Sequence, residues 1–244
     1  MRFAHAIYEA GLNAQYECSS GIGNSSVDFK IINVPGWLVE LTSFRISAAV
    51  KEHTVTKGNI SEYLSITGDN SNAPEVRDII KSQEAICRKV SDSCNFKEKG
   101  NPIKFPEIKE NSYHMLLIDM RSFNAGMSDL YDYWNIAYGS TSLINYNHGI
   151  YCRNWCTPDG KTSLIKGLFD DLHPDNRSQY IRDKIHVLGF VHEKHYAEQE
   201  LINNIYFLYN PKFFKSKMDI IKIFPCAKNE LLHLCANLNG KPNS

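Results

Sequence analysis

Residues 27–42 read Val27-Asp28-Phe29-Lys30-Ile31-Ile32-Asn33-Val34-Pro35-Gly36-Trp37-Leu38-Val39-Glu40-Leu41-Thr42. Two β-rich runs flank the turn residues of 33–36, so the stretch predicts a β-hairpin. If the hairpin is centred on Val34, Asp28 lies directly across from Glu40. Directly opposed side chains have Cβ atoms about 4.5–5.5 Å apart, where like charges repel. A divalent metal with oxygen ligands would remove that repulsion. The alternative is a different register that leaves both acids in water.

The composition limits the class of protein. The chain has 244 residues, of which 43% are hydrophobic and 22% charged, and this is typical of a globular protein. Its formal net charge is zero, which argues against a strongly basic nucleic-acid binder but allows a local basic groove. No run approaches the roughly 20 apolar residues of a membrane span. Seven cysteines without a framework spacing favour a reduced, cytoplasmic compartment.

The order of the expected elements predicts the fold class. We expect a helix within 3–10, a strand over 12–18, the hairpin, a helix from about Pro74 to Val90, and strands over 113–123, 185–191 and 204–209. The helix from Pro74 has an apolar stripe at helical spacing, formed by Val76, Ile79, Ile80, Ala85, Ile86 and Val90. Residues 47–73 and 91–111 read as loops, 124–180 as an irregular middle with helical pieces around 130–136, and 228–236 as a short helix. Residues 1–244 are therefore expected to form a single α/β domain around one mixed sheet.

This order, with an acid on each hairpin strand, resembles the PD-(D/E)xK, or restriction-endonuclease-like, nuclease superfamily. The resemblance is carried by Ser26–Phe29 and Leu38–Thr42, while 117–121 and 185–191 are similar to an uncharacterised bacterial branch. It implies a restriction-endonuclease-like core within residues 1–125. Residues 126–214 would be an elaboration with further strands, and 215–244 a tail.

The resemblance also implies a metal site. Asp28 and Glu40 would hold Mg²⁺ or Mn²⁺, with the backbone carbonyl of Leu41 and with Glu9 of the first helix as further ligands. The metal would activate water for phosphodiester hydrolysis. The position of the superfamily's lysine is Thr42 here, and threonine cannot supply a cation.

Other basic residues could take the place of that lysine. The candidates are Lys81 and Lys89 on the following helix and Arg45 just beyond the strand. We also expect Glu40 to be an exposed ligand at a strand end, whose removal leaves no cavity and does not destabilise the metal-free protein.

Two functions from different classes remain. The first is a Mg²⁺-dependent nuclease related to restriction or defence, acting on nucleic acid with DNA favoured over RNA, with a homodimer as one expected state. The second is a catalytically degenerate nuclease fold that acts as a nucleic-acid or protein interaction module. Thr42 favours the second function, while the pair Asp28 and Glu40 favours the first.

Other groups of residues give weaker indications of a functional site. Asp119 and Arg121 form an alternative acid–cation pattern at a strand end, where an ordinary ion pair is the simpler explanation. His148, Cys152 and Cys156 have a loose spacing for zinc, and 192–195 reads as a polar turn. The aromatic residues Trp134, Tyr138, Tyr151 and Trp155 are expected in the core rather than in contact with bases.

Overall fold

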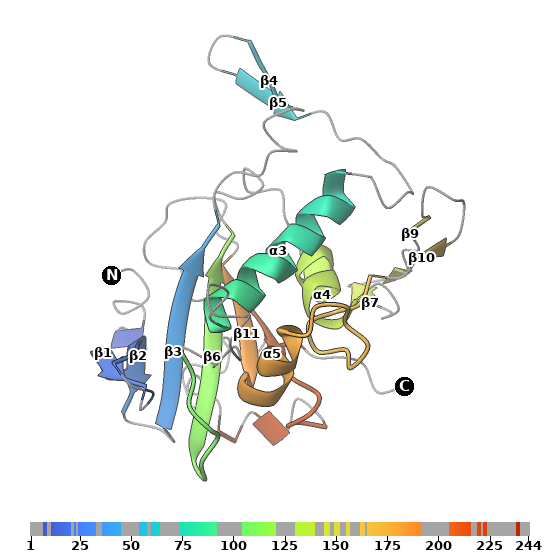
Figure 1. The fold of residues 1–244 in the computed structure, drawn as a ribbon. Helices are drawn as coiled ribbons and strands as arrows, with labels where there is room; N and C mark the ends of the chain where they lie inside the picture. Colours follow the sequence, from blue (N-terminus) through green and yellow to red (C-terminus); the bar gives the residue numbers. More distant parts are fainter. Residues whose placement is uncertain are drawn as a thin grey trace.

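The largest element of this computed structural model is a mixed sheet of seven strands (Figure 1). In order across the sheet the strands are β1 (Ala14–Ser19), β2 (Ser26–Ile31), β3 (Gly36–Ser43), β6 (Ser112–Asp119), β11 (Val187–Val191), β12 (Ile205–Tyr209) and β13 (Leu238–Asn239). The structure describes residues 7–8, 11–20, 22, 24–32, 36–44, 54–57, 60–63, 74–91, 104–120, 130–139, 144–146, 149–151, 155–156, 162–163, 165–191, 205–215, 219–220, 222–223 and 238–239.

The pairing of the strands is antiparallel at one side and parallel in the middle. β1 pairs antiparallel with β2, and β2 with β3. β3, β6 and β11 are mutually parallel, and β11 then pairs antiparallel with β12. The expected α/β fold around one mixed sheet is therefore confirmed.

Three helices cover one face of this sheet: α3 (Pro74–Val90), α4 (Leu130–Tyr138) and α5 (Ser178–Lys184) (Figure 1). Parallel neighbours need a long crossover, and α3 provides it between β3 and β6, while α4 and α5 lie between β6 and β11. Ile86 and Val90 of α3 are buried in one cluster with Leu38, Leu116 and Ile118 of the sheet. This cluster fixes the last turns of α3 over β3 and β6.

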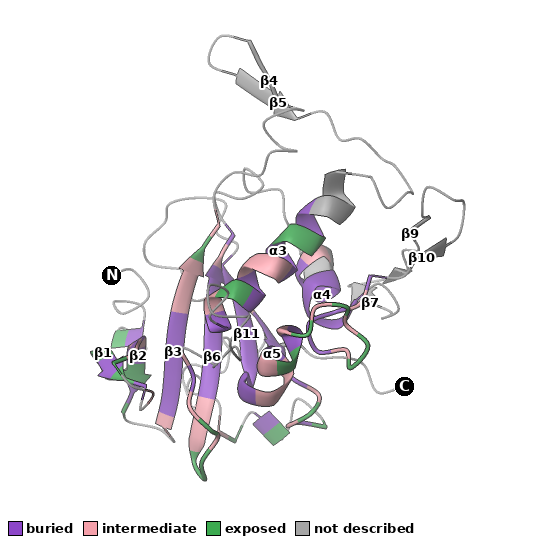
Figure 2. Ribbon diagram, in the orientation of Figure 1, coloured by how far each residue is buried: buried purple, intermediate pink, exposed green. Residues whose placement is uncertain are grey.

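A second apolar cluster lies on the opposite sheet face, because side chains alternate along a strand. Trp37, Val39, Met115 and Leu117 belong to it. The indole Nε1–H of Trp37 donates to the carbonyl of Ile223 over 2.7 Å, which ties the segment after β12 to β3. β3 and β6 are thus buried on both faces along their middle parts (Figure 2).

Several expectations for the less regular segments need correction. Residues 54–63, expected to be a loop, contain an antiparallel pair of strands, β4 (Thr54–Lys57) and β5 (Ile60–Tyr63). The irregular middle also contains two short pairs, β7 (Ile144–Tyr146) with β8 (Gly149–Tyr151), and β9 (Trp155–Cys156) with β10 (Thr162–Ser163). The helix expected at 228–236 lies outside the described residues.

The apolar stripe predicted on α3 is only partly buried, since Ala85 is half-buried. The side chain of Val76 lies outside the described residues, as do those of Tyr151 and Trp155. Trp134 and Tyr138 are buried in the core, as expected. Ile79 and Ile86 of the predicted stripe are buried, but Ile80 is 41% exposed, because it lies on the solvent side of α3.

None of the helices in the described part of the chain has the length and apolar character of a membrane span.

Gln83 connects α3 to α4 and to the segment after it. Its amide Nε2–H groups donate to the carbonyls of Ile136 (3.2 Å) and Lys166 (2.8 Å). Its Oε1 lies 3.3 Å from Nε2 of His173. Nδ1 of His173 accepts the backbone N–H of Asp175, so Nε2 carries the proton and donates to Gln83. Gln83 therefore adds a second donor to the Ile136 carbonyl at the end of α4, which also accepts the backbone N–H of Leu168, and it joins α3 to the segment of Lys166.

We expect Gln83→Leu to destabilise the protein by about 1–3 kcal/mol, because it removes the amide donor of the Lys166 carbonyl and the acceptor of His173 Nε2. Urea denaturation measures the effect. The matched control is Lys81→Met on the exposed side of the same helix, which should change the unfolding free energy by less than about 0.5 kcal/mol. Equal effects of the two substitutions would contradict this role of Gln83.

His114 and His186 form a buried link between the starts of β6 and β11. The backbone N–H of His114 donates to Nδ1 of His186 over 3.1 Å, and the N–H of His186 donates to the carbonyl of His114 over 2.9 Å. Burial lowers the pKa of His114 to about 4 and that of His186 to about 3. Protonation of Nδ1 in His186 would also remove the acceptor for His114.

This pair predicts a loss of stability in mild acid. Both histidines have folded-state pKa values below the usual 6.5, so the unfolded chain binds more protons as pH falls through this range. Stability is complete above about pH 6.5 and falls toward pH 4, with a slope of up to about 1.4 kcal/mol per pH unit for each histidine. Urea denaturation between pH 7.5 and 5 tests this. His186→Asn keeps an acceptor and should flatten the slope, and an unchanged slope would exclude His186 as a cause.

Candidate functional site

The hairpin has the register that its sequence predicts. Phe29 pairs with Val39, Lys30 with Leu38, and Ile31 with Trp37, so the next opposed positions are 28 and 40. Since Phe29 and Val39 face one cluster, Asp28 and Glu40 face the other side of the sheet, under α3. Both acids therefore share one face at the point where the regular pairing of β2 with β3 ends.

The two acids replace ladder hydrogen bonds at this point. The backbone N–H of Leu41 donates to Oδ2 of Asp28 over 2.7 Å. The backbone N–H of Asp28 donates to Oε2 of Glu40 over 3.2 Å. Each carboxylate thus holds the other residue's strand, and this reciprocal arrangement fixes the two side chains relative to each other.

Two lysines converge on the other oxygen of Glu40. Nζ of Lys89, from the last turn of α3, lies 2.7 Å from Oε1, and Nζ of Lys104 lies 3.1 Å from the same atom. Lys104 also donates to the carbonyl of Ser26 over 3.2 Å. We call Asp28, Glu40, Lys89 and Lys104 the acid–lysine cluster.

The burial of Glu40 contradicts our expectation of an exposed ligand. Its side chain is 1% exposed, whereas those of Lys89 and Lys104 are 31% and 25% exposed. A charged carboxylate is rarely buried to this extent unless it is paired. The lysine side chains and the partly exposed Asp28 therefore form the solvent-facing side of the cluster.

Of the two lysines predicted on α3, the structure brings one to the acids. Lys89 contacts Glu40, while Lys81 is exposed two turns earlier, and none of the described contacts joins it to the acids. Thr42 follows Glu40 on the same face of β3 by strand alternation and is partly buried. Position 42 thus lacks a cation, and Lys89 brings one from the helix.

Sequence reasoning did not assign Lys104 to the site. Nothing in the local pattern around Lys104 points to β2 or β3. The contact depends on how the segment before β6 returns along the hairpin, which is a long-range feature. Phe105 next to it is fully buried in the cluster under α3, and this anchors the segment.

The alternative acid, Asp119, lies on the wrong face. β3 and β6 are neighbours, with Glu40 opposite Leu116 and Ser43 opposite Asp119. Leu116 shares the face of Glu40, so Asp119, three positions further, points to the opposite face. Asp119 therefore does not join Asp28 and Glu40, and its predicted companion Arg121 lies outside the described residues.

Other candidates cannot be placed. Glu9, Arg45, His148, Cys152 and residues 192–195 lie outside the described part of the chain, as does the side chain of Cys156. Among the described residues, no group of three or more His, Cys, Asp and Glu side chains could hold a metal ion. A zinc site is therefore not found among the side chains that the structure describes.

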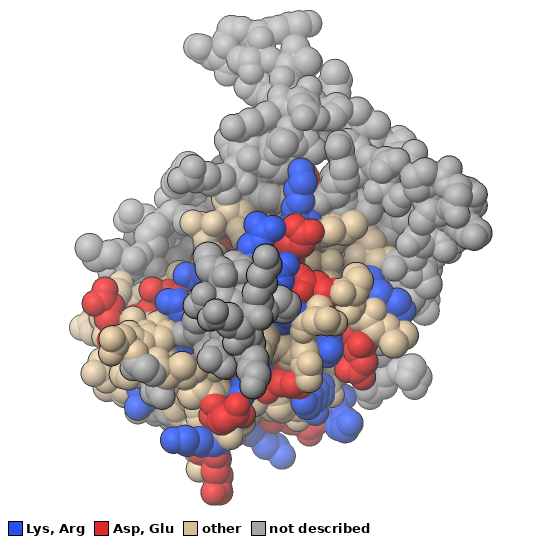
Figure 3. Space-filling model, viewed as in Figure 1, with Lys and Arg blue, Asp and Glu red and all other residues tan. Residues whose placement is uncertain are grey.

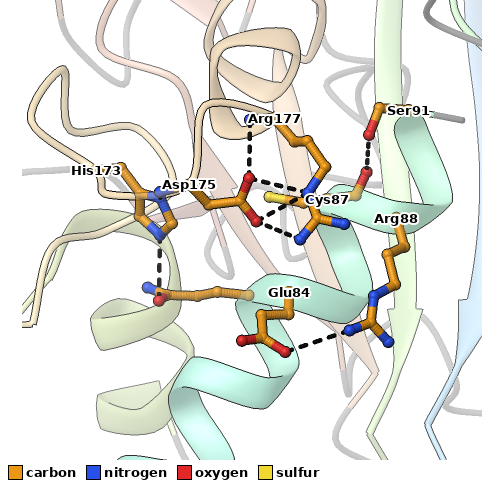
Figure 4. A network of polar contacts seen from close by, with 8 residues as sticks. Glu84, Cys87, Arg88, Ser91, His173, Asp175 and Arg177 are labelled. Carbon is orange, nitrogen blue, oxygen red and sulfur yellow. Dashed lines mark hydrogen bonds and ion pairs between the residues drawn. The ribbon is translucent and has the colours of Figure 1, made fainter. Parts of the chain in front are cut away.

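A second polar cluster lies beside α3 and contains Cys87, His173, Asp175 and Arg177 (Figure 4). It does not have the properties of a catalytic centre. Burial raises the pKa of the Cys87 thiol to about 12, and the negative charge of Asp175 adds to this effect. Both ring nitrogens of His173 already have partners, Gln83 and the N–H of Asp175. Cys87 is thus held protonated, and His173 has no unused nitrogen to activate it.

The two acids of the acid–lysine cluster carry the oxygen donors that a hard divalent cation prefers, although in this structure Lys89 and Lys104 lie against Glu40. Mg²⁺ keeps several waters and usually takes only one or two carboxylates from a protein. Asp28 and Glu40 supply two, and the carbonyl of Leu41 on the same strand can add an oxygen. The two lysines at Glu40 already place positive charge beside this buried carboxylate.

The surface over α3 has no continuous area of one sign. Lys and Arg side chains alternate with Asp and Glu side chains in the described part of this face (Figure 3). Exposed pairs such as Arg88 with Glu84, on α3, contribute to this alternation. In the described part of this face, positive charge is therefore not gathered into one patch.

Comparisons with known proteins give no further assignment. The chain matches no protein-family model, no curated protein and no solved structure. The assignment of a function therefore rests on the geometry of the acid–lysine cluster itself.

We expect Glu40→Ala to destabilise the metal-free protein, in contrast to the expectation from sequence. The substitution leaves two ammonium groups without their carboxylate partner and the N–H of Asp28 without its acceptor. Breaking a buried ion pair costs about 3–5 kcal/mol, and the partial exposure of the lysines reduces this to about 1–3 kcal/mol. Thermal and urea denaturation measure the effect.

A double-mutant cycle provides the control. Adding Lys89→Met to Glu40→Ala should cost less than it does in the wild type, because the lysine has already lost its partner. Additive effects would show that the contact between Lys89 and Glu40 does not contribute to stability.

Proposed function

We propose that this chain is a divalent-metal-dependent nuclease that hydrolyses phosphodiester bonds. One observation carries the proposal: the register of β2 and β3 gives two carboxylates on one sheet face, and a helix lysine contacts one of them. An α/β sheet with an acid on each strand of a hairpin, followed by a helix and a parallel strand, is what the PD-(D/E)xK resemblance implies. We propose a restriction-endonuclease-like core on this basis.

Asp28 and Glu40, with the carbonyl of Leu41, would hold Mg²⁺ or Mn²⁺. The bound ion would lower the pKa of a coordinated water and neutralise charge on the phosphoryl group. The protein's part is to fix the two carboxylates, which it does through the N–H groups of Leu41 and Asp28. Fixed acids need little rearrangement when a ligand binds, which favours catalysis.

Lys89 would take the place of the lysine that is missing at Thr42. Its ammonium group reaches the same carboxylate from the helix instead of from the strand. There it can donate to a phosphate oxygen or orient the attacking water. An ammonium group keeps its charge whichever element presents it, so the change of position does not by itself remove this function.

We propose a nucleic acid as the substrate, with DNA favoured over RNA, and a reduced, cytoplasmic compartment. The two described cysteine side chains, Cys18 and Cys87, are free thiols, in agreement with such a compartment. A homodimer and a role in restriction or defence are further parts of the same proposal.

The second candidate is a nuclease fold that binds nucleic acid without cleaving it. The observation in its favour is that both oxygens of Glu40 already have partners in the buried cluster. A carboxylate used only to hold α3 and the segment of Lys104 in place would have the same contacts. The two functions differ in whether cleavage depends on the metal.

We expect Mg²⁺- or Mn²⁺-dependent cleavage of DNA that Asp28→Asn abolishes. Asparagine keeps an oxygen to accept the N–H of Leu41, so the fold is retained while one ligand charge is lost. The assay uses single- and double-stranded DNA and RNA, with and without each metal. The matched control is Asp119→Asn on the opposite sheet face, which should cleave at the wild-type rate.

The same assay tests the replacement of the missing lysine. Lys89→Met should lower kcat by about 10²–10³-fold, the usual effect of removing one group that stabilises charge in the transition state. Lys81→Met should leave kcat unchanged. Wild-type protein that binds nucleic acid but cleaves none of the four substrates would favour the second candidate.

A further inference from the structure

The acid–lysine cluster is electrically balanced without a metal ion. Asp28 and Glu40 carry two negative charges, and Lys89 and Lys104 carry two positive charges. Oε1 of Glu40 lies 2.7 Å from one ammonium nitrogen and 3.1 Å from the other, while Oε2 accepts a backbone N–H. These charges cancel, so no net negative charge is left for a divalent cation to neutralise.

A cation that binds Glu40 would be placed next to both ammonium groups. Like charges a few ångströms apart repel strongly at a partly buried site, where salt screens them less than at the surface. At least one lysine therefore has to leave Glu40 before the carboxylate can bind a metal. The lysines thus act as competitors of the metal in the free protein.

The two lysines are able to leave. Each side chain is long and partly exposed, at 31% for Lys89 and 25% for Lys104, whereas Glu40 is 1% exposed and fixed. A displaced ammonium group needs a new anionic partner close to the same site. A phosphodiester group is singly charged and accepts hydrogen bonds from ammonium groups, so it can provide that partner.

We propose that Lys89 and Lys104 make binding of the metal conditional on a phosphodiester ligand. In the free protein they neutralise Glu40, and when the ligand binds they turn to its phosphate and release the carboxylate to the cation. The inference rests on the proposed function and adds to it a coupling between two ligands, with Lys104 as a second phosphate-binding residue. Because linkage is reciprocal, the metal must strengthen binding of the phosphodiester by the same factor.

Calorimetric titration with Mn²⁺ tests the coupling without relying on activity. The titrations use the wild-type protein alone, with a phosphorothioate DNA oligonucleotide that resists cleavage, and with an uncharged methylphosphonate oligonucleotide of the same sequence. Binding of Mn²⁺ by each oligonucleotide alone is measured separately and subtracted. The charged oligonucleotide should tighten Mn²⁺ binding by about 5- to 150-fold, the usual range of coupling between two sites, and the uncharged one should not.

Lysine variants show whether these side chains cause the coupling. Lys104→Met, and separately Lys89→Met, should bind Mn²⁺ more tightly than the wild type when no oligonucleotide is present, by at least about 5-fold. Each should also show a smaller effect of the charged oligonucleotide. Lys81→Met, which removes the same charge from the exposed side of α3, should behave as the wild type.

The outcomes separate the inference from the proposed function. Mn²⁺ binding that depends on Asp28 but is unaffected by the charged oligonucleotide overturns the coupling and leaves the nuclease proposal standing. Lysine variants that bind Mn²⁺ no more tightly than the wild type overturn it as well. Mn²⁺ binding that is unchanged in Asp28→Asn places the metal elsewhere and overturns both proposals.

Discussion

A buried carboxylate in the middle of the sheet is the constraint on which this structure depends. Glu40 lies on β3, which is paired on both sides and covered on both faces, and such an acid is strongly destabilising unless cations neutralise it. The required cations come from the end of α3 and from the segment before β6. One side chain therefore holds together the hairpin, the crossover helix and the return to the next parallel strand.

An apolar residue at position 40 would meet the needs of packing alone. Replacing buried ion pairs by apolar side chains is often neutral or stabilising, so a buried charged cluster is weak evidence for a stabilising role. The acid–lysine cluster also has a solvent-facing side, formed by Asp28 and the two lysine side chains. We therefore interpret the cluster as a site for ligands, whose cost in stability the rest of the core offsets.

Local sequence predicted the features that depend on neighbours in the chain. The turn residues at 33–36 fixed the register of the hairpin, and Pro74 with the apolar stripe gave the helix that carries Lys89. The burial of Glu40 could not be predicted in this way, because it depends on the pairing of β6 with β3, two strands that lie far apart in the sequence. The same long-range pairing decides that Lys104 reaches Glu40 and that Asp119 faces away from it.

Crystals grown with Mn²⁺ and a cleavage-resistant phosphorothioate oligonucleotide would test the central claim most directly. The account predicts an anomalous difference peak between the carboxylates of Asp28 and Glu40, with the ammonium group of Lys89 or Lys104 moved from Glu40 to a phosphate oxygen. No anomalous peak at these acids, with both lysines still on Glu40 and the oligonucleotide bound elsewhere, would contradict it.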